Sequence, residues 1–102
     1  MPERRVRVTA EALVELDAQL PETLHHAFVH QDLFPALDLV GTDWEHLPLR
    51  SPSLDQYRVL IARGTTVYAM RLHAELDVDG GVSVTSITVD LDGPQDWPAT
   101  DG

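Results

Sequence analysis

The segment Asp79-Gly80-Gly81 is the strongest turn signal in this chain, and it restricts the fold more than any other feature. Asp-Gly and Gly-Gly pairs readily adopt the positive φ angles that tight hairpin turns require. The flanking segments, 65–78 and 82–91, alternate polar and apolar residues. Such alternation is typical of strands with one buried face. We therefore predict that these two segments form an antiparallel hairpin.

A second hairpin is predicted just before the first. Residues 57–62, YRVLIA, are rich in branched and aromatic side chains, and Arg63-Gly64 is a turn signal. The alternation within 82–91 is irregular, which indicates a β-bulge or burial on both faces. The three strands together predict a meander. The expected core face of the strand 65–78 carries Tyr68, Met70, Leu72, Ala74 and Leu76.

Helical spacing dominates the N-terminal part. Residues 10–20 place apolar side chains at helical intervals, and Thr9 offers a hydroxyl for the helix N-terminus. After Pro21, residues 22–33 continue the helical pattern. We therefore expect two consecutive helices that form a hairpin.

The segments on either side of these helices are less regular. Residues 4–9, RRVRVT, alternate around two valines and predict a short strand. Residues 34–56 contain Pro35, Pro48 and Pro52. We expect a connecting segment there, with at most one further helical turn over 35–40.

This order of elements predicts an α+β fold. The fold class is a two-layer sandwich, in which an N-terminal strand and a helical hairpin pack on a C-terminal antiparallel β-meander. A chain of 102 residues has the size of one domain. We assign residues 1–91 to that domain and residues 92–102 to an acidic C-terminal tail that contains proline and glycine.

Charge narrows the classes of function. The chain has 17 acidic residues against seven arginines, for a net charge of -10, and it has no cysteine. Nucleic-acid binding depends largely on cations, so the overall balance disfavours it. No apolar run is long enough to cross a bilayer, so we expect no membrane partner and a cytoplasmic location. No motif implies a cofactor.

These features favour a small, acidic, non-enzymatic interaction protein. We expect it to bind a basic protein partner or to assemble with itself. A homodimer could form by pairing of sheet edges, either at the strand near Val6 or at the strand that ends at Leu91.

Two segments resemble the RelE/ParE superfamily of bacterial toxin components. VTAEALVELDAQLPE is similar to the family's opening strand and helix, and YRVLIARGTTVYAMRLH is similar to its central hairpin. The resemblance implies, as an alternative function, the toxin component of a toxin–antitoxin system that has kept or lost catalysis. It implies ribonuclease-like chemistry by basic residues on the sheet, with Arg58, Arg71 and His73 as the catalytic candidates.

Other residues are candidates for binding. The proposed binding residues are Arg63, Trp44, Trp97, Asp90 and Asp92. An exposed tryptophan often anchors a partner, but a tryptophan that locks a loop or tail to the core is the alternative. Arg4, Arg5 and Arg7 could contact phosphate, or they could pair with the acidic C-terminal strand.

His26 and His30 are the candidate metal ligands. On a helix they lie one turn apart on the same face, and Glu22 could supply a third ligand. Two imidazoles alone do not define a zinc site, so ordinary half-exposed histidines are the alternative.

Overall fold

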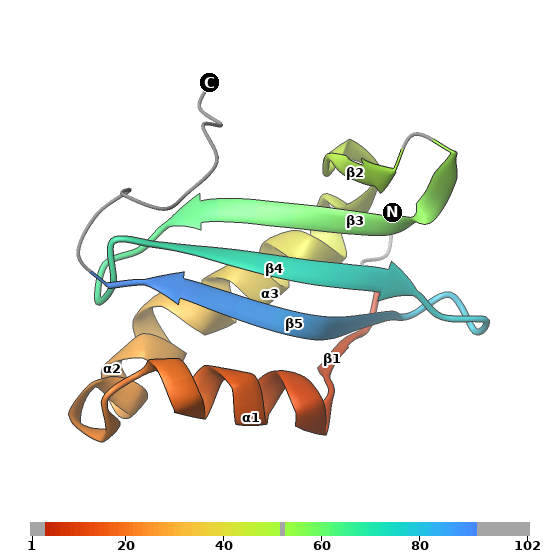
Figure 1. The fold of residues 1–102 in the computed structure, drawn as a ribbon. Coiled ribbons are helices and arrows are strands. Elements are labelled where there is room, and N and C mark those ends of the chain that lie inside the picture. Colours follow the sequence, from red (N-terminus) through yellow and green to blue (C-terminus); the bar gives the residue numbers. More distant parts are fainter. Residues whose placement is uncertain (1–3, 52, 92–102) are drawn as a thin grey trace.

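The computed structural model describes residues 4–51 and 53–91, which form a helical layer on one face of a mixed β-sheet (Figure 1). This arrangement confirms the predicted α+β sandwich. The helical elements are α1 (Ala10–Gln19), η1 (Glu22–Leu24), α2 (His25–Phe28), η2 (Val29–Leu33), α3 (Phe34–Thr42) and η3 (Trp44–His46). The strands are β1 (Val6–Val8), β2 (Leu49–Ser51), β3 (Leu54–Arg63), β4 (Ala69–Leu76) and β5 (Val82–Asp90).

The five strands lie in the order β1-β5-β4-β3-β2. Strands β3, β4 and β5 form the predicted antiparallel meander, and β1 joins its outer side parallel to β5. The helical elements connect β1 to β2 at the opposite edge of the sheet, and the meander then returns to place β5 beside β1.

The core lies between the sheet and the helices. Along β4, Met70, Leu72 and Ala74 are buried, as the alternation predicted. Their partners across the layer are the fully buried Phe28 and Val40. Apolar burial of this kind is the main source of stability for such a small sheet.

A β-bulge in β5 explains why polar and apolar residues alternate irregularly over 82–91. His73 pairs with Ser86, whereas the next residue, Ala74, pairs with Val84. Thr85 is therefore the extra residue. The bulge changes the phase of the strand so that both Val84 and Ile87 face the core, and both are completely buried.

The first helix has the bounds that its sequence predicted. The hydroxyl of Thr9 accepts a hydrogen bond from the Ala12 N–H at 3.2 Å, which satisfies one free donor of the first turn. The helix ends at Gln19, just before Pro21. Leu16 faces the core from its inner side.

The prediction of a connecting segment over 34–56 was wrong, because the second helix does not end near Pro35, the segment contains strand β2, and β3 begins at Leu54 instead of Tyr57. Helical backbone runs from Glu22 to Thr42, and η3 and β2 follow. The reason is a π turn, η2, in which the N–H of Phe34 donates to the carbonyl of Val29, five residues back. The wider turn lies directly before Pro35, which has no N–H to donate, so the helix continues.

The expected strand over 65–78 also begins later, at Ala69. Residues 64–68 form a loop that is held by the buried carboxylate of Asp32 in the π turn. That carboxylate accepts the backbone N–H groups of Thr65 at 2.7 Å, Thr66 at 2.8 Å and Val67 at 3.2 Å. These three bonds point the N–H groups into the helical layer instead of along a strand ladder.

Gly64 is required beside this carboxylate. A Cβ atom at Gly64 would lie 2.8 Å from Oδ2 of Asp32 and 2.6 Å from the carbonyl oxygen of Val67. Both distances are shorter than non-bonded atoms tolerate, and one of these atoms is backbone. The Arg63-Gly64 turn signal therefore reflects the close approach of a carboxylate.

Helix α1 covers the part of the β5 edge that β1 leaves open. Glu15 accepts the N–H of Ile87 at 2.9 Å, and Gln19 accepts the N–H of Val89 at 2.9 Å. The amide of Gln19 also donates to the carbonyl of Ile87 at 2.7 Å. These side chains take the place of a neighbouring strand, so this edge is not available for strand pairing.

We expect Asp32→Asn to lower the free energy of unfolding by about 1–3 kcal/mol. The substitution replaces one of the two carboxylate oxygens that accept the three backbone N–H groups by an NH₂ group, which cannot accept. Denaturant unfolding measures the change. Asp38→Asn is the matched control, since Asp38 is an exposed residue on the same helix and should change stability by less than about 0.5 kcal/mol. Equal effects of the two substitutions would contradict the role of Asp32.

Candidate functional site

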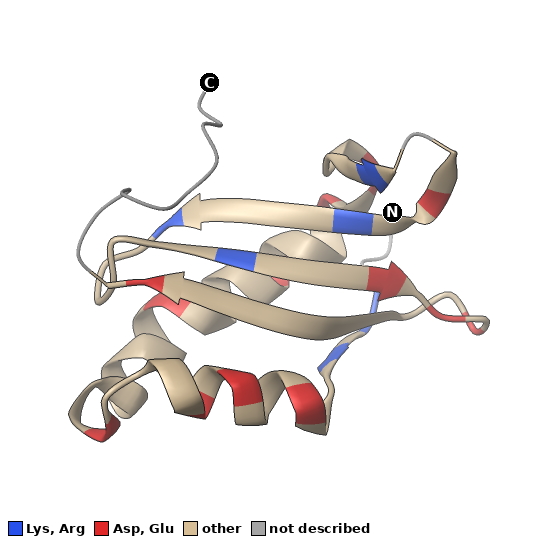
Figure 2. Cartoon of the chain, viewed as in Figure 1, with Lys and Arg blue, Asp and Glu red and all other residues tan. Residues whose placement is uncertain are grey.

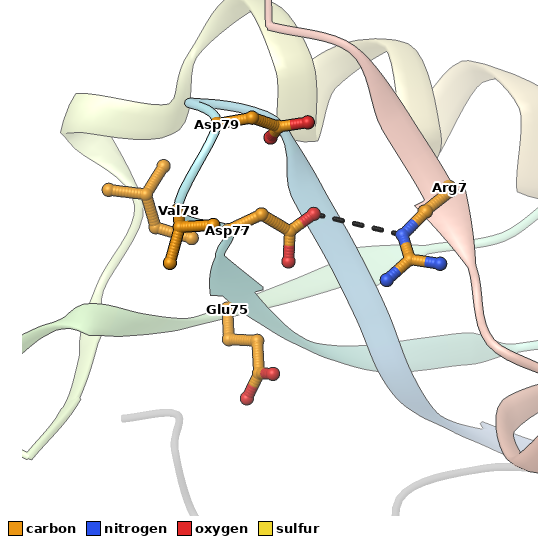
Figure 3. A pocket seen from close by; sticks show the side chains of 6 residues that line it. Arg7, Glu75, Asp77, Val78 and Asp79 are labelled. Atoms are coloured by element: carbon orange, nitrogen blue, oxygen red, sulfur yellow. Dashed lines mark ion pairs between the residues drawn. The ribbon is translucent and has the colours of Figure 1, made fainter.

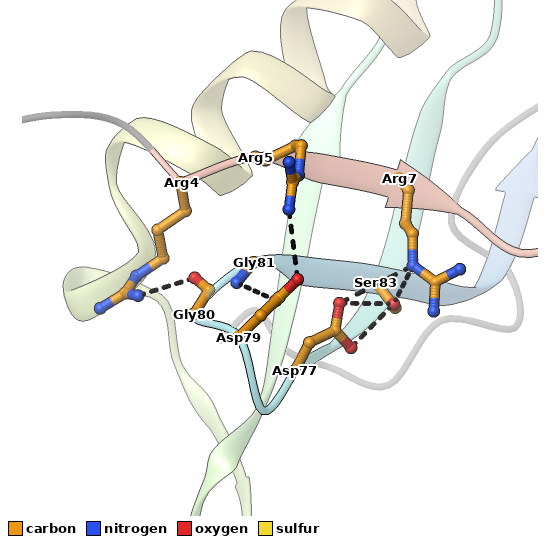
Figure 4. Close-up of polar contacts among 8 residues, drawn as sticks. All are labelled: Arg4, Arg5, Arg7, Asp77, Asp79, Gly80, Gly81 and Ser83. Carbon is orange, nitrogen blue, oxygen red and sulfur yellow. Dashed lines mark hydrogen bonds and ion pairs between the residues drawn. The ribbon is translucent and has the colours of Figure 1, made fainter.

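The loop between β4 and β5 is the most acidic short segment of the described sheet. The N–H of Asp77 donates to the carbonyl of Gly81 at 2.7 Å, which closes the loop. Gly80 has a φ of +91°, a conformation that favours glycine. The N–H of Gly81 donates to the Asp79 carboxylate at 2.9 Å. The predicted hairpin is thus present, and its turn is rigidly bonded (Figure 4).

Arginines of the N-terminal strand hold one side of this loop. Arg5 forms an ion pair with Asp79 at 3.2 Å, and Nε of Arg7 lies 3.7 Å from the Asp77 carboxylate. Nε of Arg7 also donates to the hydroxyl of Ser83 at 2.9 Å, and that hydroxyl contacts Asp77 at 3.0 Å. Figure 4 shows these contacts between β1 and the loop.

Arg4 is engaged in the same region. It donates to the Gly80 carbonyl at 2.9 Å and to the Glu45 carboxylate at 2.8 Å. The second bond lowers the pKa of Glu45. The bond from the Gly81 N–H is the main cause that lowers the pKa of Asp79. Arg5 and Arg7 therefore pair with acidic residues of the β4–β5 loop, and Arg4 pairs with Glu45, rather than with the acidic C-terminal strand that one prediction named.

A shallow hollow of about 420 Å³ lies on the outer side of the loop (Figure 3). Arg7, Glu75, Asp77, Val78 and Asp79 line it. Within the described part of the chain, the carboxylate of Glu75 makes no hydrogen bond or ion pair, and Val78 is fully exposed. The hollow thus combines an apolar tip with three carboxylates, two of which already have arginine partners.

The catalytic candidates do not form one cluster. Arg71 and His73 project from β4 onto the face of the sheet that the helices leave uncovered, because Leu72 between them faces the core. Arg58 pairs across the strands with Ala74, a core-facing position, so its side chain lies on the opposite face.

Arg58 has a structural role on the helical face. Its guanidinium donates to the backbone carbonyls of Trp44 at 3.4 Å, Glu45 at 3.2 Å and Leu47 at 3.1 Å. It also lies over the Trp44 ring, with its carbon 5.4 Å from the centroid. Arg58 therefore terminates η3 and anchors the segment before β2.

His73 lies in a positive environment. Partial burial is the main cause that lowers its pKa from the ordinary value of 6.5, and the nearby cations Arg50 and Arg71 lower it further. Glu15 acts in the opposite direction. The imidazole is therefore mainly neutral at pH 7, a state in which it can accept a proton.

The predicted binding residues are dispersed. Trp44 is only 2% exposed, so it locks a segment to the core, and the idea of an exposed anchor is corrected. Arg63 is exposed and lies over the Tyr68 ring, 4.8 Å from its centroid. Asp90 ends β5, where its carbonyl accepts the N–H of Tyr68 at 2.9 Å. Asp92 and Trp97, with the predicted tail 92–102, lie outside the described residues.

The structure brings the two candidate metal ligands together. The rings of His26 and His30 are 4.4 Å apart, and Phe34 packs against His30 at 5.3 Å. In the described residues, no group of three or more His, Cys, Asp or Glu side chains is placed to hold a metal ion. The two histidine rings are tilted against each other, and the Phe34 ring meets His30 edge-on, on the exposed side of the helix.

Comparison with protein-family models, with curated proteins and with solved structures gives no significant match. Within the described ranges, no helix has the length and apolar character needed to cross a membrane.

Sequence reasoning missed Glu75 and Asp32. Glu75, Asp77 and Asp79 give three acidic residues without a base between 75 and 79, which is a signal for an acidic surface. No comparable sequence pattern points to Asp32, the aspartate of the π turn. Its role depends on a loop more than 30 residues later in the chain.

Acidic and basic residues are unevenly distributed over the described part of the molecule (Figure 2). Acidic residues lie along α1 and around the β4–β5 loop, whereas Arg5, just before β1, and Arg7 of β1 face that loop. Since Arg5 and Arg7 are already paired with Asp79 and Asp77, the surplus of negative charge remains on the outer side of the loop.

We expect the titration midpoint of His73 to lie below 6.5 and to rise in Arg50→Ala, because one cation is removed. The ring-proton NMR signal of His73 reports the midpoint. The folded state binds fewer protons than the unfolded state in this range, so the free energy of unfolding should fall as pH drops through about 6.5. Arg5→Ala is the control, and an unchanged midpoint in Arg50→Ala would contradict this assignment.

Proposed function

We propose that this protein is a non-enzymatic interaction module that binds a basic segment of a protein partner. The binding surface is the hollow beside the β4–β5 loop, lined by Glu75, Asp77, Val78 and Asp79. The observation that carries the proposal is the Glu75 carboxylate, which lines the hollow without a partner in the described part of the chain.

The chemistry of this surface suits an arginine. A guanidinium offers a planar set of donors that matches a carboxylate such as Glu75. The fully exposed side chain of Val78 offers apolar contact to the aliphatic part of the same residue. Asp77 and Asp79 keep the local potential negative although each has an arginine nearby.

The loop also meets the requirement for a preformed site. Its backbone is closed by the Asp77–Gly81 and Asp79–Gly81 bonds, and Ser83 fixes the Asp77 carboxylate. A rigid surface loses little conformational freedom when a partner binds. Contacts of this kind raise the association rate and weaken with salt.

We expect a nona-arginine peptide to perturb the amide NMR signals of residues 75–79 more than those of α3. Glu75→Gln should weaken binding several-fold at low salt, about what one lost charge contact costs. Asp38→Asn removes the same charge from α3 and is the matched control. Equal weakening by both variants would show a general charge effect and would contradict this surface.

A second candidate function has one observation in its favour. His73 is held neutral beside Arg71 on the open face of the sheet, which is compatible with a RelE/ParE-like ribonuclease. Against this candidate, Arg58 lies on the other face.

This candidate predicts growth arrest when the chain is expressed alone in a bacterial host, with recovery in Arg71→Ala and His73→Ala. Colony counts after induction measure the effect, and protein levels of each variant are the control. An acidic binding module predicts normal growth with abundant protein, and arrest that is relieved by both variants would overturn it.

A further inference from the structure

Over its second half, strand β3 forms a sheet edge that the described structure leaves uncovered. Strand β2 pairs with β3 only through Leu49–Arg58 and Ser51–Leu54, and Pro48 accepts the N–H of Val59 at 3.0 Å. Within residues 4–51 and 53–91, no strand lies beside residues 60–63 on that side. Figure 1 shows β2 beside only the first part of β3.

The direction of the free backbone groups follows from two bonds. The N–H of Val59 points toward β2, and the N–H of Gly64 points toward β4, where it donates to Tyr68 at 3.1 Å. Backbone groups alternate along a strand. The N–H and C=O groups of Ile61 and Arg63 therefore point outward, away from β4.

Apolar surface borders this edge on both sides. On the open face of the sheet, Ile61 is 47% exposed. On the helical face, a groove of about 160 Å³ lies between β3 and the helix, with Leu39, Ala62 and Met70 among its lining residues. Leu39 is 41% exposed at its rim. A strand added here would cover apolar side chains above and below it.

The edge differs in charge from the rest of the surface. Of the residues that line the groove, the one carboxylate belongs to Asp32, which is buried and accepts three backbone N–H groups. Arg63, which also lines the groove, is an exposed positive charge at the edge. A second copy of a chain with a net charge of -10 can approach here without placing exposed carboxylates against each other.

We infer that the protein forms a homodimer through this edge, with residues 61–63 of two copies paired antiparallel about a twofold axis at Ala62. Ile61 of each copy then lies opposite Arg63 of the other. Each of these two pairs exchanges two backbone hydrogen bonds. The pairing joins the two sheets into one continuous ten-stranded sheet.

Two features favour a second copy over an unrelated strand. The free segment is short, being bounded by β2 and by the turn at Gly64. The backbone N–H and C=O groups that point outward belong to Ile61 and Arg63, one residue on either side of Ala62. A twofold axis at Ala62 therefore lets each copy bond the free groups of the other. Paired residues at the axis approach to about 4.5 Å between Cα atoms, and the small alanine side chain accommodates this distance.

This edge is not one of the two that the sequence suggested. Glu15 and Gln19 of α1 cover the β5 edge, and β1 pairs with β5 for three residues. The proposed dimer uses neither the β4–β5 loop nor the surface that binds a basic partner. The two proposals can therefore fail separately.

Analytical ultracentrifugation of the full chain over a range of concentrations tests the dimer. We expect a reversible monomer–dimer equilibrium. Ile61→Lys should raise the dissociation constant by about tenfold or more, since it places two like-charged pairs opposite each other. Ile61→Glu should preserve or strengthen the dimer, because its carboxylate lies opposite Arg63 of the second copy.

The matched control is Leu54→Lys. Leu54 is a 42% exposed residue on the part of β3 that β2 covers, so its substitution should leave the dimer unchanged. A chain that stays monomeric at all concentrations would overturn the inference. A dimer that Ile61→Lys and Leu54→Lys affect equally would also overturn it.

A single introduced cysteine tests the register directly. The chain has no cysteine, so the thiol of Ala62→Cys would be unique. In the proposed pairing the two Cα atoms at position 62 lie within the range of a disulfide. We expect covalent dimers on non-reducing gels after mild oxidation of Ala62→Cys, and none for Leu54→Cys. Equal yields for the two variants would exclude a twofold axis at Ala62.

Discussion

The carboxylate of Asp32 joins the helical layer to the sheet, and much of the architecture depends on that connection. It accepts three consecutive N–H groups of the loop before β4, which delays the start of that strand until Ala69. The same contact requires a glycine at position 64. Because a buried acceptor of three donors is costly to remove, the loop and the π turn are stabilised together.

The π turn that carries Asp32 also explains the length of the second helix. It precedes Pro35 and lets helical backbone continue to Thr42. Val40 thereby enters the core, and Leu39 borders the groove beneath β3. One local irregularity therefore supports the core and shapes the uncovered edge.

Opposite charges within the chain have a second organising role. Arg5, just before β1, and Arg7 of β1 contact the acidic β4–β5 loop, which holds the first strand against the sheet. These contacts engage the cations that could otherwise bind phosphate. Glu75 has no such partner in the described part of the chain, and this asymmetry supports the proposal of a surface for a basic segment.

Local patterns in the sequence determined the fold class, the helix over 10–20 and the meander, because alternation and helical spacing depend on neighbouring residues alone. The irregular phase of 82–91 indicated either a bulge or burial on both faces, and the register at Thr85 shows a bulge. The π turn, the role of Asp32, the separation of Arg58 from Arg71 and His73, and the free edge at Ile61 came only from the tertiary structure. Each depends on contacts between residues far apart in the chain, and no local pattern of side chains specifies which distant backbone groups meet.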